Sequence, residues 1–369
     1  MIYLDHHATT PCDPRVVEKM LPYFTEIFGN PASLTHVHGR KAANALEDAR
    51  IVIARFFRIA PNELTFTAGA TESNNIALNL VQPGEHFITS AVEHKSVLVP
   101  AKRIDDVTIL PVDGEGFVDP DALRVAIRPN TRLVSIEAAN SEIGTLQPIA
   151  ELSAICRERG ILFHSDITQA AGKIDVDLPS LDLASFSAHK LYGPKGIGGL
   201  YVRRGVRIRP LVAGGGQERG VRAGTVNVPG AVGFAAAIQL RAAEMADEAL
   251  RLTEMRNELR DRLVAEIDGV SVSGPRALRL PGNLNVRFDR VEADSLIVAM
   301  RNFSLSSGSA CSSGERGPSP VMKALGLDDD AALGSIRIGL GKSNTREELS
   351  MLVDDLRRAV ARLREIAVG

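Results

Sequence analysis

Lys190 is the residue of this sequence best placed to act as an amine nucleophile. It closes the apolar segment LASFSAHK, and the glycine-rich turn LYGPKGIGG follows it. A lysine at the end of an apolar strand is partly desolvated, which lowers its pKa and makes the amine available for imine formation. A solvated surface lysine is the ordinary alternative. Ser187 and His189 lie beside it in the sequence, however, and both could donate hydrogen bonds to a phosphate, which favours a reactive lysine.

A second segment, ELTFTAGATESNN, could bind the phosphate itself. A strand runs into Gly69, Ala70 and Thr71 and then into a helix. Free backbone N–H groups, a hydroxyl and the positive end of a helix therefore meet at one point, which suits a dianion. The same pattern also describes an ordinary strand-to-helix turn, so it predicts a phosphate site only together with the lysine segment.

Asp166 and Gln169 follow a third apolar segment, which begins ILFHSD. Ligands of open α/β sheets bind at the carboxyl ends of the strands, so Asp166 should face a binding crevice. A carboxylate is what a pyridinium nitrogen needs, because the ion pair keeps the ring protonated and able to accept electrons. Taken alone, Asp166 could equally cap a helix.

Cys311 lies in a Ser- and Gly-rich segment, SLSSGSACSSGERGPSP, with no apolar stripe around it. We expect an exposed thiol that a nearby base can deprotonate and that can move between a cofactor and an external acceptor. A plain surface cysteine is the alternative. Cys156 lies instead in an apolar helical pattern, ELSAICRERG, which predicts a structural thiol. Cys12, beside a helix cap, is interpreted as incidental.

Alternating strands and helices must position these segments. Short runs rich in β-branched residues are separated by helical patterns, which predicts a parallel sheet covered on both faces; the runs are ELTFTAG, HFITSAV, VTILPV, RLVSIEAAN, ILFHSDI and LASFSAH. Asp13-Pro14 and Asp119-Pro120 each predict the start of a helix, because a capping side chain precedes a proline at the first helical position.

The pattern changes after Gly216, where the sequence predicts a long Ala-rich helix from about Pro229 to Ile267. Three short strands alternate with helices beyond it, and the last helix opens with the capping box of residues 345–348. Because 369 residues exceed one compact core of ordinary size, we predict a large domain over 13–250 and a smaller α+β domain from 1–12 and 251–369.

Composition and charge exclude several classes of partner. A net charge of −2, with 44% hydrophobic and 24% charged residues, indicates a globular chain without a field that recruits nucleic acid or anionic membrane. No apolar stretch could span a bilayer, and the N-terminus lacks the apolar region of a secretory signal. Three widely spaced cysteines favour a reducing compartment, so we expect a cytoplasmic protein. The histidines lack partners at metal-ligand spacing, and we expect no metal site.

Taken in order, several motifs resemble those of the cysteine desulfurases, pyridoxal 5′-phosphate (PLP) enzymes of the class V aminotransferase group: YLDHHATTP, GNPAS, ATESNN, EHKS, NSEIG, SFSAHKLYGPKG, GGGQERGVRAGT, SSGSAC and SIRIGLG. The resemblance covers nearly the whole chain. It implies the type I fold of PLP-dependent transferases, with a mainly parallel sheet flanked by helices, and a homodimer that shares its active site. It also implies removal of sulfur from L-cysteine, which leaves alanine and a persulfide on Cys311 for a protein acceptor.

The resemblance assigns a role to each matching residue. Lys190 would form the Schiff base with PLP, and His94 would stack on the ring as an acid or base. Asp166 would pair with the pyridinium nitrogen, and Gln169 would donate to the ring hydroxyl. The phosphate would be held by Ala70, Thr71, Ser187, His189 and, from the neighbouring subunit, Thr225.

For the substrate, the resemblance implies Arg337 as a bidentate clamp on the carboxylate, with Asn30 of GNPAS as a further contact. The chain departs from the family pattern at one place. Relatives usually have Asn immediately before the Glu of NSEIG, whereas here Ser141 stands between Asn140 and Glu142. Either Ser141 makes a weaker contact to the cofactor, or Asn140 makes it after a small local shift.

Two other functions remain compatible with these motifs. A different class V activity, such as a selenocysteine lyase or an aminotransferase, would not use Cys311 as its nucleophile. A sulfur-relay or scaffold protein with weak catalysis would keep the fold for partner binding, although the intact Lys190, Asp166, His94 and Arg337 argue against it. The sulfur acceptor also stays open among an iron-sulfur scaffold, a thionucleoside enzyme and a DNA-modification partner.

Overall fold

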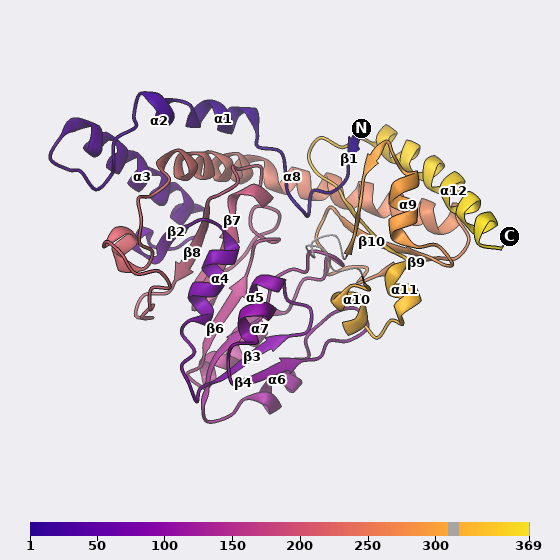
Figure 1. The fold of residues 1–369 in the computed structure, drawn as a ribbon, viewed down its shortest axis with the longest axis horizontal. Coiled ribbons are helices and arrows are strands. Elements are labelled where there is room, and N and C mark those ends of the chain that lie inside the picture. The colour runs from indigo at the N-terminus through magenta and orange to yellow at the C-terminus, as the bar shows by residue number, and fades with distance from the viewer. Residues whose placement is uncertain (309–316, 369) are drawn as a thin grey trace.

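The larger sheet of the protein lies beside a smaller one (Figure 1). The computed structural model describes residues 1–308 and 317–368. Within them the larger sheet has seven strands, in the spatial order β2 (Leu64–Thr67), β8 (Gly198–Val202), β7 (Leu183–Ser187), β6 (Leu162–Asp166), β5 (Thr131–Ser135), β3 (His86–Ser90) and β4 (Asp106–Leu110). Each of the six runs predicted as strands overlaps one of these strands.

The seven-stranded sheet is mainly parallel, as the sequence predicted. Its neighbours from β7 through β6, β5 and β3 to β4 are parallel, and β8 runs antiparallel to both β7 and β2. The segment that joins β7 to β8 has no helix longer than one 3₁₀ turn. A parallel neighbour would need a longer crossover, so this short connection explains the reversed direction of β8.

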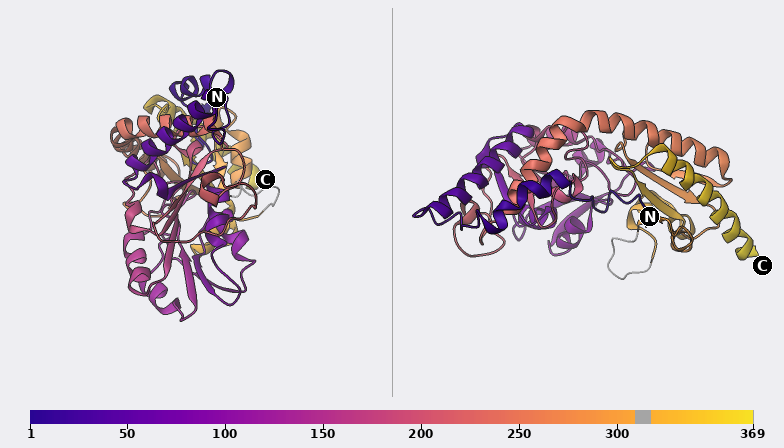
Figure 2. Two further views of the ribbon diagram at one scale, coloured as in Figure 1. Left: turned by 90° about the vertical axis from the view of Figure 1, so that its left-hand side faces the viewer. Right: turned by 90° about the horizontal axis from the view of Figure 1, so that it is seen from above.

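Helices flank the larger sheet (Figure 2), and two of them begin at the caps that the sequence predicted. Asp13 and Asp119 accept the N–H of residues 15 and 121, each at 2.9 Å, which confirms both predicted helix starts. The helices of this part are α1 (Pro14–Met20), α2 (Pro22–Thr25), α3 (Val37–Phe56), α4 (Ala70–Leu78), α5 (Lys95–Ala101), α6 (Pro120–Ala126) and α7 (Ile149–Glu158).

The long helix α8 (Val228–Glu266) leads to the smaller sheet, close to the predicted bounds. That sheet is antiparallel, in the order β12 (Ser306–Ser307), β13 (Ser335–Gly339), β10 (Asn283–Phe288) and β9 (Val270–Ser273). Beside it lie a parallel pair, β1 (Ile2–Tyr3) with β11 (Phe303–Ser304), and the helices α9 (Ala293–Ala299), α10 (Pro320–Ala324), α11 (Asp329–Leu333) and α12 (Arg346–Val368). Thr345 and Glu348 form the predicted capping box of α12.

The two sheets have separate hydrophobic cores, and α8 contributes to both. Phe234 near its start packs in the core of the larger sheet, and Leu259 near its end packs in the core of the smaller one. Leu4 belongs to the second core, which explains why the N-terminus lies beside the smaller sheet (Figure 1). We propose the division at 13–250 against 1–12 and 251–369 on this basis. Over the described ranges, no helix is long and apolar enough to cross a membrane.

Candidate active site

One cavity of about 420 Å³ is lined by most of the residues that the sequence predicted for the site. It opens where β6 and β7 end and α4 begins. The predicted residues that line it are Ala70, Thr71, His94, Asn140, Ser141, Asp166, Gln169, Ser187, His189, Lys190 and Arg337. Asn30 and Thr225 do not line it, and Cys311 lies outside the described residues.

Lys190 ends a 3₁₀ turn, Ala188–Lys190, that directly follows β7. Its Nζ donates to the carbonyl oxygens of His7 and Ala8, both at 2.7 Å. The segment before α1 therefore forms one wall of the cavity and holds the amine there. This contact joins the N-terminal segment to a strand end some 180 positions later in the chain.

The start of α4 and the end of β7 form the predicted phosphate region. Ser187 Oγ accepts the backbone N–H of Ala70 at 2.7 Å. Gly69, the N-cap of α4, has φ +153°, and a Cβ there would lie 3.3 Å from Ser187 Oγ, so glycine permits this close approach. Burial, and then Lys190, lower the pKa of His189 to about 4, which keeps its ring neutral. The region thus offers N–H and O–H donors around a helix N-terminus.

A chain of hydrogen bonds links Asp166 to His94. Asp166 Oδ1 accepts the N–H of Thr168 at 2.9 Å, and Oδ2 accepts Asn74 Nδ2 at 2.7 Å. Asn74 Nδ2 also donates to Ser96 Oγ at 2.8 Å, and His94 Nδ1 lies 2.7 Å from that oxygen. His94 Nδ1 also accepts the backbone N–H of Ser96, so the proton of a neutral ring lies on Nε2.

Sequence reasoning missed Asn74 and Ser96, although both lie in motifs that it used. Asn74 is fully buried on α4, and Ser96 is buried in the first turn of α5. A buried asparagine inside a helix is uncommon unless its amide has partners, and that was the available signal. Burial lowers the pKa of the His94 ring, while the nearby Asp166 carboxylate opposes the shift.

Gln169 is fixed by groups behind the cavity. Its Oε1 accepts Lys173 Nζ at 2.8 Å and lies 3.1 Å from His7 Nδ1, while its Nε2 donates to the His7 carbonyl at 2.9 Å. Neither His7 nor Lys173 was assigned a role from the sequence.

The Asn140 amide makes hydrogen bonds with both of its polar atoms. Nδ2 donates to the Val92 carbonyl at 3.0 Å and to Glu137 Oε1 at 2.7 Å, and Oδ1 accepts the backbone N–H groups of Glu142 and Ile143 at 2.8 and 2.9 Å. These contacts satisfy both donors and both lone pairs of the amide. In this conformation Asn140 shapes the loop that carries Ser141.

Buried carboxyl groups line the same side of the cavity. Burial raises the pKa of Glu93 to about 8 and that of Glu142 to about 7. Burial and the neighbouring Glu93 also raise the pKa of Glu137 well above its ordinary value. Glu93 Oε1 accepts the backbone N–H of Glu137 at 2.8 Å, which ties the two segments together.

Arg337 reaches the cavity from β13 of the smaller sheet and is 1% exposed. Its Nη2 donates to Asp5 Oδ1 at 2.8 Å, and its Nη1 donates to the Ser141 carbonyl at 3.3 Å. The site therefore lies between the two sheets, with the guanidinium oriented by a carboxylate and by the loop of Ser141.

Asn30 and the loop before Thr225 border a different hollow, at the end of the molecule that carries α3. A buried ion pair holds that loop: Arg50 Nη2 lies 2.7 Å from Glu218 Oε1, and both side chains are 2% exposed. Glu218 Oε2 also accepts the backbone N–H of Phe66 at 2.7 Å, which ties the loop to β2. Thr225 itself is exposed.

A model of the aminotransferase class-V family matches residues 2–352. The chain is 46% identical over 380 residues to the cysteine desulfurase IscS of Anaeromyxobacter dehalogenans, a match that covers 99% of this chain and 94% of that protein. It is 45% identical over 381 residues to the mitosomal cysteine desulfurase of Encephalitozoon cuniculi, covering 99% of this chain and 88% of that one.

Solved structures of related proteins have the same fold as this chain. A NifS-like protein superposes with a TM-score of 0.91 at 36% identity, over 98% of this chain and 99% of that chain. A structure of SspA in complex with cysteine superposes with a TM-score of 0.80 at 36% identity, over 92% of this chain and 99% of that chain.

Proposed function

Because the chain belongs to the class-V aminotransferase family and, within it, to the cysteine desulfurases, we propose that it moves the sulfur of L-cysteine onto Cys311 and releases L-alanine. The observation that carries this proposal is the meeting of Lys190, Asp166 and Arg337 in one cavity. A reactive lysine alone would serve many reactions. Together with a carboxylate for a ring nitrogen and a guanidinium for a substrate carboxylate, it suits a PLP enzyme that acts on an amino acid.

The residues present fit PLP, the cofactor of this family. Ser187 and the N-terminal end of α4 offer donors for a phosphate, and Asp166 offers a carboxylate for a ring nitrogen. Thr168 Oγ1 is buried at the cavity wall and makes no hydrogen bond within the described residues. A bound group can satisfy this oxygen, as buried polar atoms require.

When bound, PLP withdraws electrons from the substrate α-carbon and makes its proton removable. Lys190 would carry the cofactor and then accept that proton at Nζ. Asp166, held by Asn74, would keep the ring nitrogen protonated, and Arg337 would hold the substrate carboxylate. The His94 ring, with its proton on Nε2, would serve as an acid in the cavity.

The sulfur step needs no outside oxidant. The Cys311 thiolate would form an S–S bond with the substrate sulfur as the Cβ–S bond breaks, and that electron pair stays with the carbon. Protons convert this carbon into the methyl group of alanine, so the oxidation of sulfur balances the reduction of carbon. The thiols within the described residues suit this role poorly: burial raises the pKa of the fully buried Cys156 to about 12 and also raises that of the half-buried Cys12.

We also propose a homodimer in which each chain supplies Thr225 to the phosphate region of its partner. Thr225 is exposed and does not line the cavity of its own chain, which supports this arrangement. Large apolar side chains are exposed near the same end of the molecule, with Leu21, Phe24 and Phe28 at 58%, 59% and 63%. Apolar groups gathered in this way commonly mark an interface between proteins.

A protein of iron-sulfur cluster assembly or of thio-modification would receive the sulfur, and the cytoplasm would be the location. No direct contact with nucleic acid is proposed, because the net charge is −2.

Borohydride reduction tests the cofactor assignment. The protein loaded with PLP should absorb visible light, lose that band on reduction, and carry the label on Lys190. A label on Lys173 or Lys195 would show that the reactive lysine is misassigned.

Substitution of Cys311 tests the sulfur step. Cys311→Ser should bind PLP and change its spectrum when cysteine is added, yet release almost no alanine or sulfide. Cys12→Ser is the matched control and should turn over normally. If Cys311→Ser also turns over normally, the chain is a lyase or an aminotransferase that does not use this thiol.

A further inference from the structure

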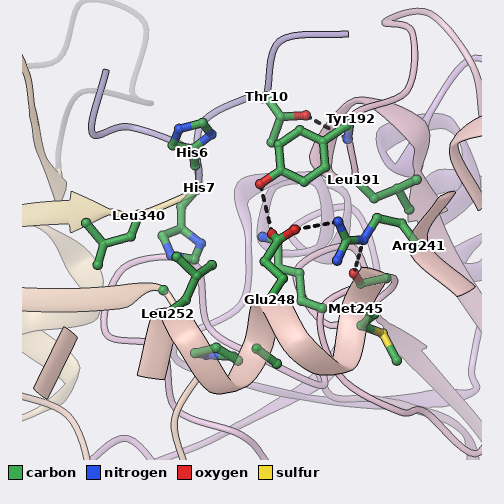
Figure 3. Close-up of a pocket in the computed structure, with 15 residues that line it drawn as sticks. His6, His7, Thr10, Leu191, Tyr192, Arg241, Met245, Glu248, Leu252 and Leu340 are labelled. Atoms are coloured by element: carbon green, nitrogen blue, oxygen red, sulfur yellow. Dashed lines mark hydrogen bonds and ion pairs between the residues drawn. The ribbon is translucent and has the colours of Figure 1, made fainter. Parts of the chain in front are cut away.

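A second, much smaller cavity shares His7 with the reaction cavity. Its volume is about 20 Å³, room for a single water. Lys173 lines it, and Tyr192, Glu248 and Arg241 form another part of its wall (Figure 3). Tyr192 and Arg241 both donate to the Glu248 carboxylate, at 3.0 and 2.6 Å, so this wall is a fixed hydrogen-bonded unit.

Gln169 lies between Lys173 and the reaction cavity. Lys173 Nζ donates to Gln169 Oε1 at 2.8 Å, and Gln169 itself lines the reaction cavity. A protonated lysine has donors only, so the atom of Gln169 that faces Lys173 must be the amide oxygen. His7 Nδ1 contacts the same oxygen at 3.1 Å and must donate to it, because an amide oxygen only accepts.

The orientation of the amide decides what Gln169 offers to a bound group. One hydrogen of Nε2 is used by the His7 carbonyl. An amide NH₂ group has two hydrogens, so one remains for the reaction cavity. The amide oxygen cannot turn toward that cavity without losing the hydrogen bonds from Lys173 and His7. Gln169 is thereby set as a donor.

We propose that Lys173 is a positioning residue that locks the Gln169 amide with its N–H toward the ring oxygen of the bound cofactor. This inference rests on the proposed function, because PLP supplies that oxygen. Burial, and then the charge of Lys190, lower the pKa of Lys173 to about 7, with Glu248 opposing and with Arg337 and Arg241 adding to the shift. A neutral amine still has two N–H groups, so Lys173 can still donate to the amide oxygen after it loses its proton.

Lys173→Met tests the lock, because methionine has similar length and no donor. Without Lys173 the amide can turn, and the ring oxygen loses one hydrogen bond, so PLP binding should weaken about 2- to 13-fold. The pH midpoint of the visible band should also rise, since the change removes a donor and a cation that both favour an ionised ring oxygen. Lys195→Met is the matched control, because Lys195 is exposed and solvent screens its charge.

A double substitution separates the lock from a general charge effect. In a Gln169→Met background, Lys173→Met should weaken PLP binding by less than half as much, in logarithmic terms, as it does in the parent protein. Equal effects in both backgrounds, or a Lys173→Met protein that matches Lys195→Met, would overturn the inference and leave the proposed function intact. A parent protein that takes up no PLP at Lys190 would overturn both.

Discussion

The buried ion pair between Arg50 and Glu218 should set the stability of the loop that leads to Thr225. Glu218→Ala would leave the guanidinium at 2% exposure without its bidentate partner. Arg50 would keep the Leu64 carbonyl at 2.7 Å and the exposed Glu47 as weaker partners. Glu218 and the next residue have φ of 47° and 54°, in the left-handed region, so the loop depends on this contact to hold an unfavourable backbone.

The expected cost follows from what each change leaves unpaired. Removing one partner of a buried ion pair costs about 3–5 kcal/mol, and we expect Glu218→Ala to lose that much. In the double variant Arg50→Met with Glu218→Met, no buried charge remains. The backbone N–H of Phe66 then lacks its acceptor, which costs about 1–3 kcal/mol. The double variant should therefore be more stable than Glu218→Ala alone.

Urea unfolding followed by far-UV circular dichroism measures these differences, with the slope checked in each variant. Asp354→Ala is the control, because it breaks an exposed pair with Arg357 on α12 (side chains 54% and 47% exposed) and should cost less than about 1 kcal/mol. If the double variant loses as much stability as Glu218→Ala alone, or more, the reasoning is refuted.

Three further predictions concern the residues around the cavity. The raised pKa values of Glu93 and Glu137 mean that the folded protein binds more protons than the unfolded chain, so its stability falls as the pH rises from 5 to 8. Glu137→Gln should reduce this fall, by about 1.4 kcal/mol for each unit by which it brings a raised pKa closer to its unfolded value. Urea unfolding at both pH values measures the fall, and an unchanged fall contradicts the prediction. Arg337→Lys should raise the KM for cysteine about 10- to 150-fold with a smaller change in kcat, since lysine cannot bind a carboxylate bidentately. Steady-state alanine release measures both constants, and an unaltered KM argues against Arg337 as the residue that binds the substrate carboxylate. Asn140→Ala should destabilise the protein by about 2 kcal/mol or more, because it removes the buried hydrogen bonds to Val92 and Glu137. Ser141→Asn should instead tighten PLP binding about 2- to 13-fold. If Asn140→Ala weakens PLP binding and Ser141→Asn leaves it unchanged, the cofactor contact belongs to Asn140.

Local signals predicted the parts of the fold that depend on neighbouring residues. Asp13, Asp119 and Thr345 each cap a helix through a contact three positions away or fewer, so a short stretch of sequence contains the whole cause. The direction of β8 has a different origin. It depends on how the chain returns after Lys190, and a strand pattern alone does not state its direction.

The site divides in the same way. Asp166 ends β6, and Lys190 ends the short turn that directly follows β7. The carboxyl ends of neighbouring parallel strands lie at one edge of an open sheet, so the meeting of these residues followed from the order of elements. Asn74 and Lys173 act through side chains on other segments, and no spacing rule relates them to Asp166 or to Gln169. Thr225 shows a further limit, because a residue that we propose to act in a neighbouring subunit has no target within its own chain.

The length of α8 places a constraint on how this sequence can change. The helix has 39 residues, about 58 Å of continuous rise, and its two ends are embedded in different cores. Deleting one residue between Phe234 and Leu259 would turn everything beyond it by about 100° and move it by about 1.5 Å along the axis. Arg337 would then leave the cavity even though every residue of the site remained. Differences in length between this chain and a functional variant should therefore fall in surface loops, and this stretch of α8 should change only by substitution.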